Sequence, residues 1–124
     1  MQETAPSAPY ASGITASHRE LLDQVLDKWS LQVMEELCER PQRFNELRRA
    51  IPVVTQKSLT AALRRLERNG MVERVVTNMR PLAVEYRITT LGKTLQDLID
   101  ALLRWTTDNM DGVERARERY DQEV

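Results

Sequence analysis

The feature that most constrains the fold is a change of hydrophobic period at Asn69-Gly70. Before this point, Leu59, Leu63 and Leu66 recur at the spacing of a single buried helix face. After it, the apolar residues follow the two-residue period of a β-strand. Glycine suits the boundary because it adopts the left-handed conformation at a helix C-terminus without a steric penalty. The sequence therefore predicts a helix from Gln56 to Asn69, followed directly by strands.

The segment after Gly70 predicts a two-stranded β-hairpin. Met71 to Thr77 is rich in β-branched residues, and Val84, Tyr86 and Ile88 alternate with charged residues. Residues 78–83 lie between these two runs and include a proline. We expect them to form the tip of the hairpin.

Upstream, the pattern of caps and apolar residues predicts three further helices. We expect one after Ser17, one from Ser30 to Pro41, and one from Phe44 to Ala50. Ser17 with Glu20 resembles a capping box, and Pro52 ends the third helix because it pushes Ile51 out of the helical region. Thr55 is the expected N-cap of the helix that begins at Gln56.

The two ends of the chain differ from its middle. Residues 1–16 are rich in Ala, Ser, Pro and Thr and predict a mobile tail. After Thr89 we expect a long helix whose apolar residues occupy more than one stripe: Leu91, Leu95, Leu98, Ile99, Leu102, Leu103 and Trp105. Residues 113–124 are expected to form a charged, partly helical tail. This leaves residues 17–112 as the single folded domain.

Charge is distributed very unevenly along the chain. From Arg40 to Arg87 there are eleven Lys or Arg residues and four acids, which gives this window a net charge of +7. The rest of the chain carries −8, so the formal charge of −1 conceals a polarised molecule. A basic window of this kind favours a polyanion as partner.

Composition excludes several classes of protein. One His and one Cys cannot build a usual zinc or iron site, so we expect neither a metal nor a cofactor. There is no Ser/His/Asp set, phosphate loop or glycine-rich cradle, which argues against an enzyme. The longest apolar runs are too short for a membrane span, no secretion signal is present, and a single cysteine fits a reducing compartment. We therefore expect a cytoplasmic protein.

The order of elements predicts a winged helix-turn-helix, mainly α-helical with a small β-hairpin. With its leucines buried, the Gln56–Asn69 helix turns amides, hydroxyls and cations outward, and such groups suit the edges of bases in a major groove. The predicted DNA-binding residues are Gln56, Lys57, Ser58, Thr60, Arg64, Arg65, Arg43, Asn45 and Arg80. The N-terminal members of the helix are expected to read bases, and Arg43, Asn45 and Arg80 are expected to contact the backbone.

Other interpretations compete with this one. Any single Arg or Lys on an amphipathic helix is as readily a solvated residue as a DNA contact, so the prediction depends on the whole set. A winged-helix module that binds only protein is the main alternative function, although such a module does not need a cationic outer face. Trp29, Tyr86 and Trp105 are more readily core or interface residues than the walls of an effector pocket.

Several segments, in order and at matching spacing, resemble the bacterial HxlR-type transcriptional regulators. They are Lys28-Trp29, Arg43-Phe44-Asn45-Glu46-Leu47-Arg48-Arg49, Gln56-Lys57-Ser58-Leu59-Thr60, Leu63-Arg64-Arg65-Leu66-Glu67, Asn69-Gly70-Met71-Val72-Glu73-Arg74, and Val84-Glu85-Tyr86-Arg87-Ile88-Thr89 with Leu91-Gly92. The resemblance implies a homodimer, paired through the first and last helices, that represses or activates transcription. We expect a repressor on an inverted-repeat operator; whether an effector exists stays open.

Several members of that family sense oxidants through a cysteine just ahead of the first helix. This chain has His18 and Arg19 in that region, and its only thiol is Cys38. Cys38 falls on the apolar side of the second predicted helix, next to Glu35 and Glu39. We expect it to pack as a small hydrophobic residue and to be unreactive.

Overall fold

The computed structural model describes residues 13–77, 80 and 83–123. The expected tail at residues 1–16 lies outside this part, apart from its last four residues. The elements follow in the order α2 (Ala16–Val25), α3 (Lys28–Glu39), β1 (Gln42–Arg43), α4 (Phe44–Ala50), α5 (Gln56–Arg68), β2 (Val72–Thr77), β3 (Ala83–Ile88) and α6 (Thr90–Glu123). The predicted winged helix-turn-helix is confirmed.

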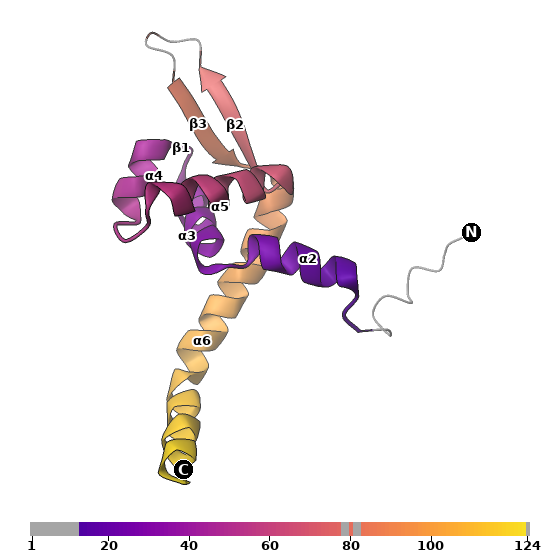
Figure 1. The fold of residues 1–124 in the computed structure, drawn as a ribbon, viewed down its shortest axis with the longest axis vertical. Coiled ribbons are helices and arrows are strands. Elements are labelled where there is room, and N and C mark those ends of the chain that lie inside the picture. Colours follow the sequence, from indigo (N-terminus) through magenta and orange to yellow (C-terminus); the bar gives the residue numbers. More distant parts are fainter. Residues whose placement is uncertain (1–12, 78–79, 81–82, 124) are drawn as a thin grey trace, which may run out of the picture.

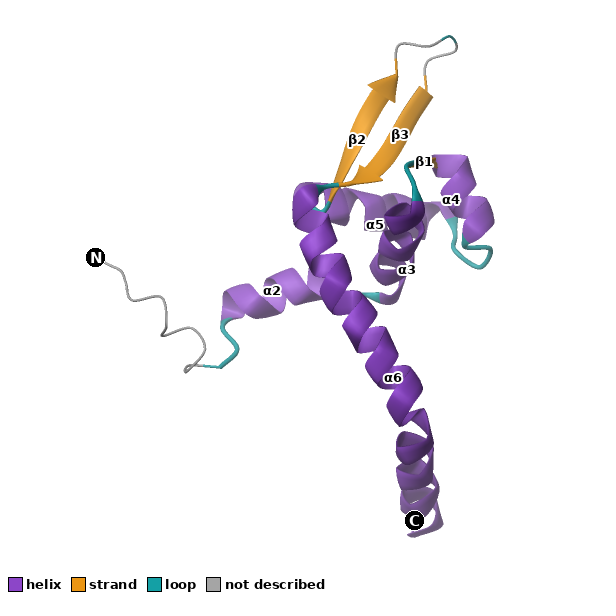
Figure 2. Cartoon of the chain, turned by 180° about the vertical axis from the view of Figure 1, so that it is seen from behind, coloured by secondary structure: helices purple, strands orange, loops and turns teal. Residues whose placement is uncertain are grey.

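Three parts extend from a small helical body, as Figures 1 and 2 show. The hairpin of β2 and β3 projects at one end, α2 projects sideways, and the C-terminal half of α6 extends away from the end opposite the hairpin. The body itself is formed by α3, α4, α5 and the first turns of α6. This arrangement leaves one face of α5 free of other elements.

The core of the body is the meeting point of α3, α4, α5 and α6. Val33, Met34 and Leu37 from α3 are fully buried, together with Leu47 from α4 and Ile99 from α6. The stripe predicted for α5 is buried as expected: Leu59, Ala62, Leu63 and Leu66. Trp29 and Tyr86 pack against this core, whereas Trp105 is 55% exposed and is not a core residue.

The sheet has one strand more than the sequence predicts. Antiparallel β1 pairs with β3, which lies between β1 and β2, and the register places Gln42 opposite Tyr86. The Gln42 side chain is buried and donates to the backbone carbonyl of Glu36 at 2.9 Å, which fixes β1 against α3. A two-residue strand has no period to detect, so the sequence gives no signal for it.

Two helix starts differ from prediction. Thr15, rather than Ser17, caps α2, and its hydroxyl accepts from the His18 backbone while Nδ1 of His18 accepts from the Thr15 backbone. Asp27, rather than Ser30, caps α3, because its carboxylate accepts hydrogen bonds from the backbone N–H groups of Trp29 and Ser30. An aspartate at the N-cap is at least as effective as a serine, so the cap that lies earlier in the chain prevails.

The predicted caps around the hairpin are confirmed. Thr55 caps α5, and Gly70 has φ 80°, the left-handed conformation expected after the helix. The Thr89 hydroxyl donates to the Gly70 carbonyl at 2.6 Å and accepts from the Gly92 backbone at 2.9 Å. The end of α5 and the start of α6 are thereby joined at the base of the hairpin.

The last helix is longer than expected. It runs without interruption from Thr90 to Glu123, through the boundary predicted at residue 112. Near its start, the buried Gln96 donates to the carboxylates of Glu35 and Asp100, which joins α6 to α3. Burial and the neighbouring Asp100 raise the pKa of Glu35 above its usual range. The division at residue 112 stays a prediction, but no break in the helix marks it.

Gly92 is the position where the fold has no room for a side chain. A Cβ atom there would lie 2.1 Å from the Met71 carbonyl oxygen. We expect Gly92→Ala to lower the free energy of unfolding by about 1–3 kcal/mol, because the start of α6 must move away from the hairpin. Urea unfolding followed by circular dichroism measures this change.

Gly112→Ala is the matched control in the same helix. Only the end of the Arg115 side chain approaches a Cβ atom there, at 3.9 Å. Alanine favours an exposed helix interior by roughly 1 kcal/mol over glycine, so this variant should be more stable than the wild type. Equal effects of the two substitutions would contradict the close approach at Gly92.

Candidate nucleic-acid interface

The outer face of α5 forms the centre of the candidate interface. The helix begins at Gln56 because the Thr55 hydroxyl accepts from the Ser58 backbone at 3.0 Å. Since the leucines are buried on the opposite side, Gln56, Lys57 and Arg64 are exposed. Ser58, half-buried, lies in the first turn beside this face.

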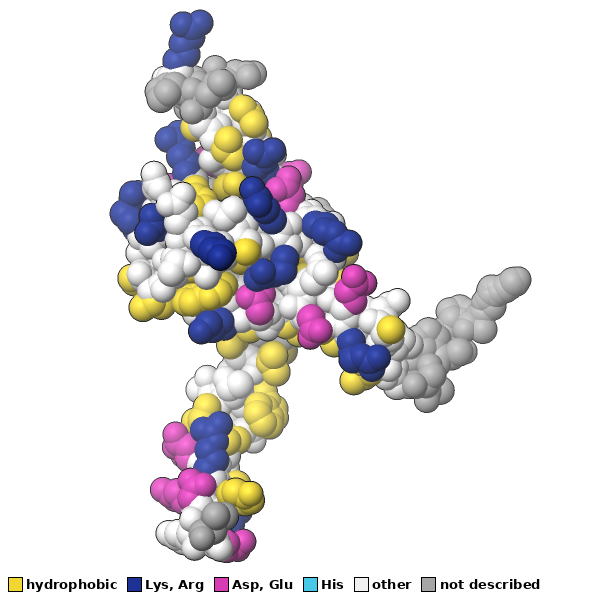
Figure 3. Space-filling model, in the orientation of Figure 1, with side chains coloured by type: hydrophobic (Ala, Val, Ile, Leu, Met, Phe, Trp, Pro, Cys, Tyr) yellow, Lys and Arg dark blue, Asp and Glu magenta, His cyan; other side chains and the backbone are white. Residues whose placement is uncertain are grey.

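A shallow depression runs along this face. It is lined by Gln56, Lys57, Thr60, Ala61 and Arg64, and no acidic residue lines it. Figure 3 shows Lys and Arg side chains gathered over the body and the lower hairpin, with acidic side chains beside them at the edge of the body and on α6. Amide, hydroxyl, methyl and cationic groups side by side match the groups that base pairs present in the major groove.

Arg65 does not belong to this face, although the sequence predicts it as a DNA contact. Its guanidinium donates to the Asp27 carboxylate at 2.9 Å and to the Gln24 backbone carbonyl at 3.3 Å. Its side chain is one-third exposed, and it lies against the junction of α2 and α3. Adjacent positions in a helix point in directions about 100° apart, which is why Arg64 and Arg65 have different surroundings.

A cleft separates α5 from the hairpin. Its volume is about 300 Å³, and it is lined by Phe44, Thr60, Leu63, Arg64, Glu67, Arg74 and Tyr86. Arg74, on β2, lies 3.8 Å from Glu67, on α5. The cleft therefore places cations of α5 and of the hairpin beside each other, so both can reach the same stretch of a phosphate backbone.

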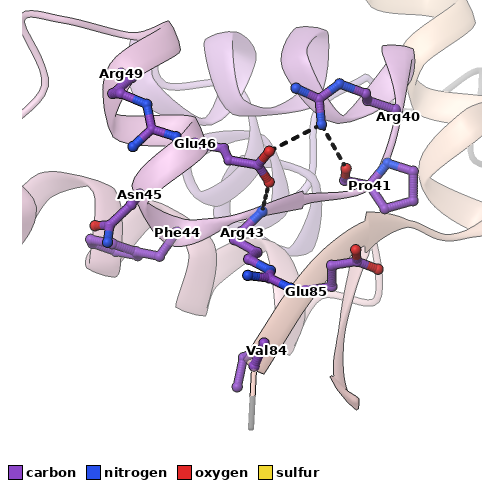
Figure 4. Close-up of a pocket in the computed structure, with 10 residues that line it drawn as sticks. Arg40, Pro41, Arg43, Phe44, Asn45, Glu46, Arg49, Val84 and Glu85 are labelled. Carbon is purple, nitrogen blue, oxygen red and sulfur yellow. Dashed lines mark hydrogen bonds and ion pairs between the residues drawn. The ribbon is translucent and has the colours of Figure 1, made fainter. Parts of the chain in front are cut away.

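Arg43 and Asn45 line a groove between α4 and β3, with a volume of about 660 Å³ (Figure 4). Glu46 occupies its centre: it accepts from the Arg43 backbone at 2.7 Å and pairs with Arg40 at 3.4 Å. These contacts, above all the backbone hydrogen bond, lower the pKa of Glu46. Glu46 thus accepts a hydrogen bond from a backbone N–H group at the N-terminus of α4. The Arg43 side chain is exposed and available to bind an anion.

The same groove contains two arginines that sequence reasoning did not select. Arg40 and Arg49 line it together with Arg43, from the loop after α3 and from α4. Both belong to the basic window that the sequence shows. The pairing of β1 with β3 is needed to bring Arg40, Arg43 and Arg49 to one groove. Arg80 is exposed in the connection of β2 to β3, away from this groove.

The structure thus brings together most of the predicted site. Gln56, Lys57, Thr60 and Arg64 share one face, and Arg43 and Asn45 share the neighbouring groove. The thirteen residues of α5 span roughly 20 Å. A helix of this length, flanked by cationic clefts and a hairpin, has the dimensions and donors of an element that enters a major groove about 12 Å wide.

Residues 24–114 match the model of the HxlR-like helix-turn-helix family. The chain belongs to this family. Among curated relatives, it is 38% identical over 104 residues to the HTH-type transcriptional regulator YdeP of Bacillus subtilis (strain 168), covering 82% of this chain and 81% of YdeP. It is 34% identical over 100 residues to YtfH of Escherichia coli (strain K12), covering 81% and 79% of the two chains.

Solved structures agree with this assignment. The regulator ytfH from Salmonella typhimurium superposes with a TM-score of 0.71 at 35% identity, covering 81% of this chain and 89% of the other. The redox regulator HypR in its reduced form gives a TM-score of 0.72 at 35% identity, covering 81% and 99%. This member of the HxlR-like family is therefore a DNA-binding transcriptional regulator with a winged helix-turn-helix fold.

Cys38 does not lie in the core, and that prediction is wrong. It is exposed near the end of α3, because the buried face of this helix contains Met34 and Leu37, and Cys38 lies outside that face. Partial burial and the carboxylates of Asp100, Glu35, Glu39 and Asp97 raise the pKa of the thiol above its ordinary value. An exposed thiol with a raised pKa is accessible but carries little of the nucleophilic thiolate at neutral pH.

We expect Cys38 to react with iodoacetamide more slowly at pH 7 than free cysteine does. Partial burial and the acidic surroundings raise the pKa of the thiol, so the pH profile of the alkylation rate should have its midpoint above that of the reference thiol. Mass spectrometry of timed samples measures the rate, and the reduced tripeptide glutathione serves as reference. A midpoint below that of the reference would show that the carboxylates do not control this thiol.

Proposed function

We propose that the chain acts as a homodimeric repressor that binds an inverted-repeat operator in cytoplasmic DNA. The observation that carries the proposal is the depression on the outer face of α5, which no acidic residue lines and where Gln56, Lys57, Thr60 and Arg64 lie together. In a dimer, two such helices would enter successive major grooves about 34 Å apart. Arg43, Asn45, Arg49 and Arg80 would hold the flanking backbone.

The proposed dimer is supported by apolar side chains that lack a partner within the described residues. Leu21 and Leu22 on α2 are exposed, as are Leu98, Leu102 and Trp105 on α6. Leu98 is 68% exposed, and Figure 3 shows apolar side chains along α6 where it leaves the body. Exposed apolar residues of this density favour association, and a second copy is the simplest partner.

Repression is proposed because it needs no surface beyond the two already described. A dimer that occupies an operator blocks access to that DNA, with the α5 faces on DNA and the apolar faces on each other. Activation would require a further surface for the transcription machinery. A reporter gene placed behind the operator distinguishes the two roles, since repression predicts higher expression when the protein is removed.

Substitution of Lys57 or Arg64 by Ala should weaken operator binding by about 1–3 kcal/mol and relax specificity at one base position. Arg43→Ala should instead weaken binding evenly across sequences and reduce the salt dependence by about one counterion, because it is proposed to contact phosphate. Fluorescence anisotropy, with operators obtained by selecting bound genomic fragments, measures both effects.

Arg119→Ala, exposed on the distal part of α6, is the charge-matched control and should bind as the wild type does. If Lys57→Ala and Arg64→Ala also bind unchanged, α5 does not read the operator. A wild-type affinity that is insensitive to salt would favour the protein-binding alternative.

Replacing Leu98 or Leu102 by Lys should convert the dimer to a monomer, because each charge would be buried against the second copy. Both side chains are exposed in the single chain, so the monomer should remain folded. Sedimentation equilibrium measures the mass, and circular dichroism measures the fold. Val76→Lys, an equally exposed apolar position on the hairpin, should leave the mass unchanged. A dimer that survives both α6 substitutions would place the interface elsewhere.

A further inference from the structure

A cluster of polar side chains joins the C-terminal end of α5 to α2. We call it the α2–α5 junction; it consists of Gln24, Asp27, Arg65, Arg68 and Asn69. The Gln24 side-chain oxygen accepts from Arg68 at 3.0 Å and from Asn69 at 2.8 Å. Its backbone carbonyl, in the last turn of α2, accepts from Arg65 at 3.3 Å. Asp27 completes the cluster through its 2.9 Å pair with Arg65.

Asp27 connects α3 to α5. The same carboxylate oxygen that pairs with Arg65 of α5 also accepts from the Trp29 and Ser30 backbones and so caps α3. Partial burial acts to raise the pKa of Asp27, but its hydrogen bonds with Ser30 and the charge of Arg65 outweigh this effect and lower it. The group is therefore ionised at neutral pH, and the pair with Arg65 is charge-assisted.

The junction is not needed to bury α5. Leu59, Leu63 and Leu66 already fix that helix on the core, and a partly exposed ion pair adds little stability by itself. The junction holds the C-terminal end of α5 against α2, and a contact at one end of a helix bears on the direction of the helix axis. Arg65 lies nine residues from Gln56, roughly 13 Å along the helix, so a tilt of about 10° there moves the base-reading end by about 2 Å.

The other side of the junction leads to the proposed dimer surface. Gln24 lies within one turn of the exposed Leu21 and Leu22 on α2. A second copy packed on those leucines would fix the position of α2. Because Gln24 and Asp27 are hydrogen-bonded to α5, the orientation of α5 would then depend on the position of α2.

We propose that Asp27 and Arg65 are positioning residues, which set the orientation of α5 relative to α2 and thereby the half-site spacing that the dimer accepts. This inference rests on the proposed function, because it concerns a dimer on an inverted repeat. It assigns to Arg65 a role in DNA recognition without contact to DNA. Arg64, its neighbour in the chain, acts by direct contact.

The test uses the full-length protein and a set of inverted repeats with identical half-sites and different spacers. Asp27→Asn and Arg65→Met remove the ion pair, and methionine keeps much of the apolar packing of the arginine stem. Relative to the wild type, each variant should lose two- to tenfold (roughly, for one half-buried pair) of its preference for the best spacer over its neighbours. The double variant should lose no more than either single one.

Arg64→Met is the matched control on the outer face. It should weaken binding by the same factor at every spacer, since it removes a contact and leaves the geometry unchanged. Unfolding in urea and circular dichroism confirm that each variant is folded. If Asp27→Asn loses the α3 cap and unfolds, Arg65→Met, which leaves the cap intact, decides the question.

Two results would overturn the inference alone: a spacer preference in Arg65→Met equal to that of the wild type, or losses in the single variants that add in the double variant. A wild type that binds none of the inverted repeats would overturn the proposed function, and the inference with it. A wild type that binds with a clear spacer preference, retained by Arg64→Met but reduced in both junction variants, supports both.

Discussion

Burial of the leucine face of α5 is the constraint on which the rest of the structure depends. Leu59, Leu63 and Leu66 are each almost inaccessible, and they belong to one buried cluster with residues of α3, α4 and the base of the hairpin. A helix that buries one face in this way must present the opposite face to solvent. The position of Gln56, Lys57 and Arg64 on the exposed side of α5 follows directly from that packing.

The hairpin depends on the same helix for its position. Gly70 ends α5 in the left-handed conformation, and the Thr89 hydroxyl, directly after β3 at the base of the hairpin, donates to the Gly70 carbonyl. Gly92 lets α6 begin in contact with the Met71 carbonyl. The end of α5, the base of the hairpin and the start of α6 therefore meet at one point, and cations of α5 and of the hairpin line the same cleft.

Apolar exposure and charge distinguish two halves of the molecule. The basic window from Arg40 to Arg87 includes α4, α5 and the hairpin, whereas the exposed leucines and Trp105 lie on α2 and α6. The α2–α5 junction connects these halves through Arg65 and Asp27. In the proposed dimer such a connection would matter, because affinity would depend on both α5 helices fitting their half-sites at once.

The sequence by itself determined the helices from α4 onward, the hairpin, the α5 caps and the identity of most of the basic face. These features are local: period, cap residues and charge are properties of neighbouring residues. Only the tertiary structure decided that Arg65 turns to Asp27, that Cys38 is exposed, that β1 adds a third strand, and that Arg40 and Arg49 join the groove of Arg43. Each of these depends on residues far apart in the chain, or on which helix face meets the core. Two neighbouring arginines look the same in a sequence, and the packing of α2 against α5 gives them different partners.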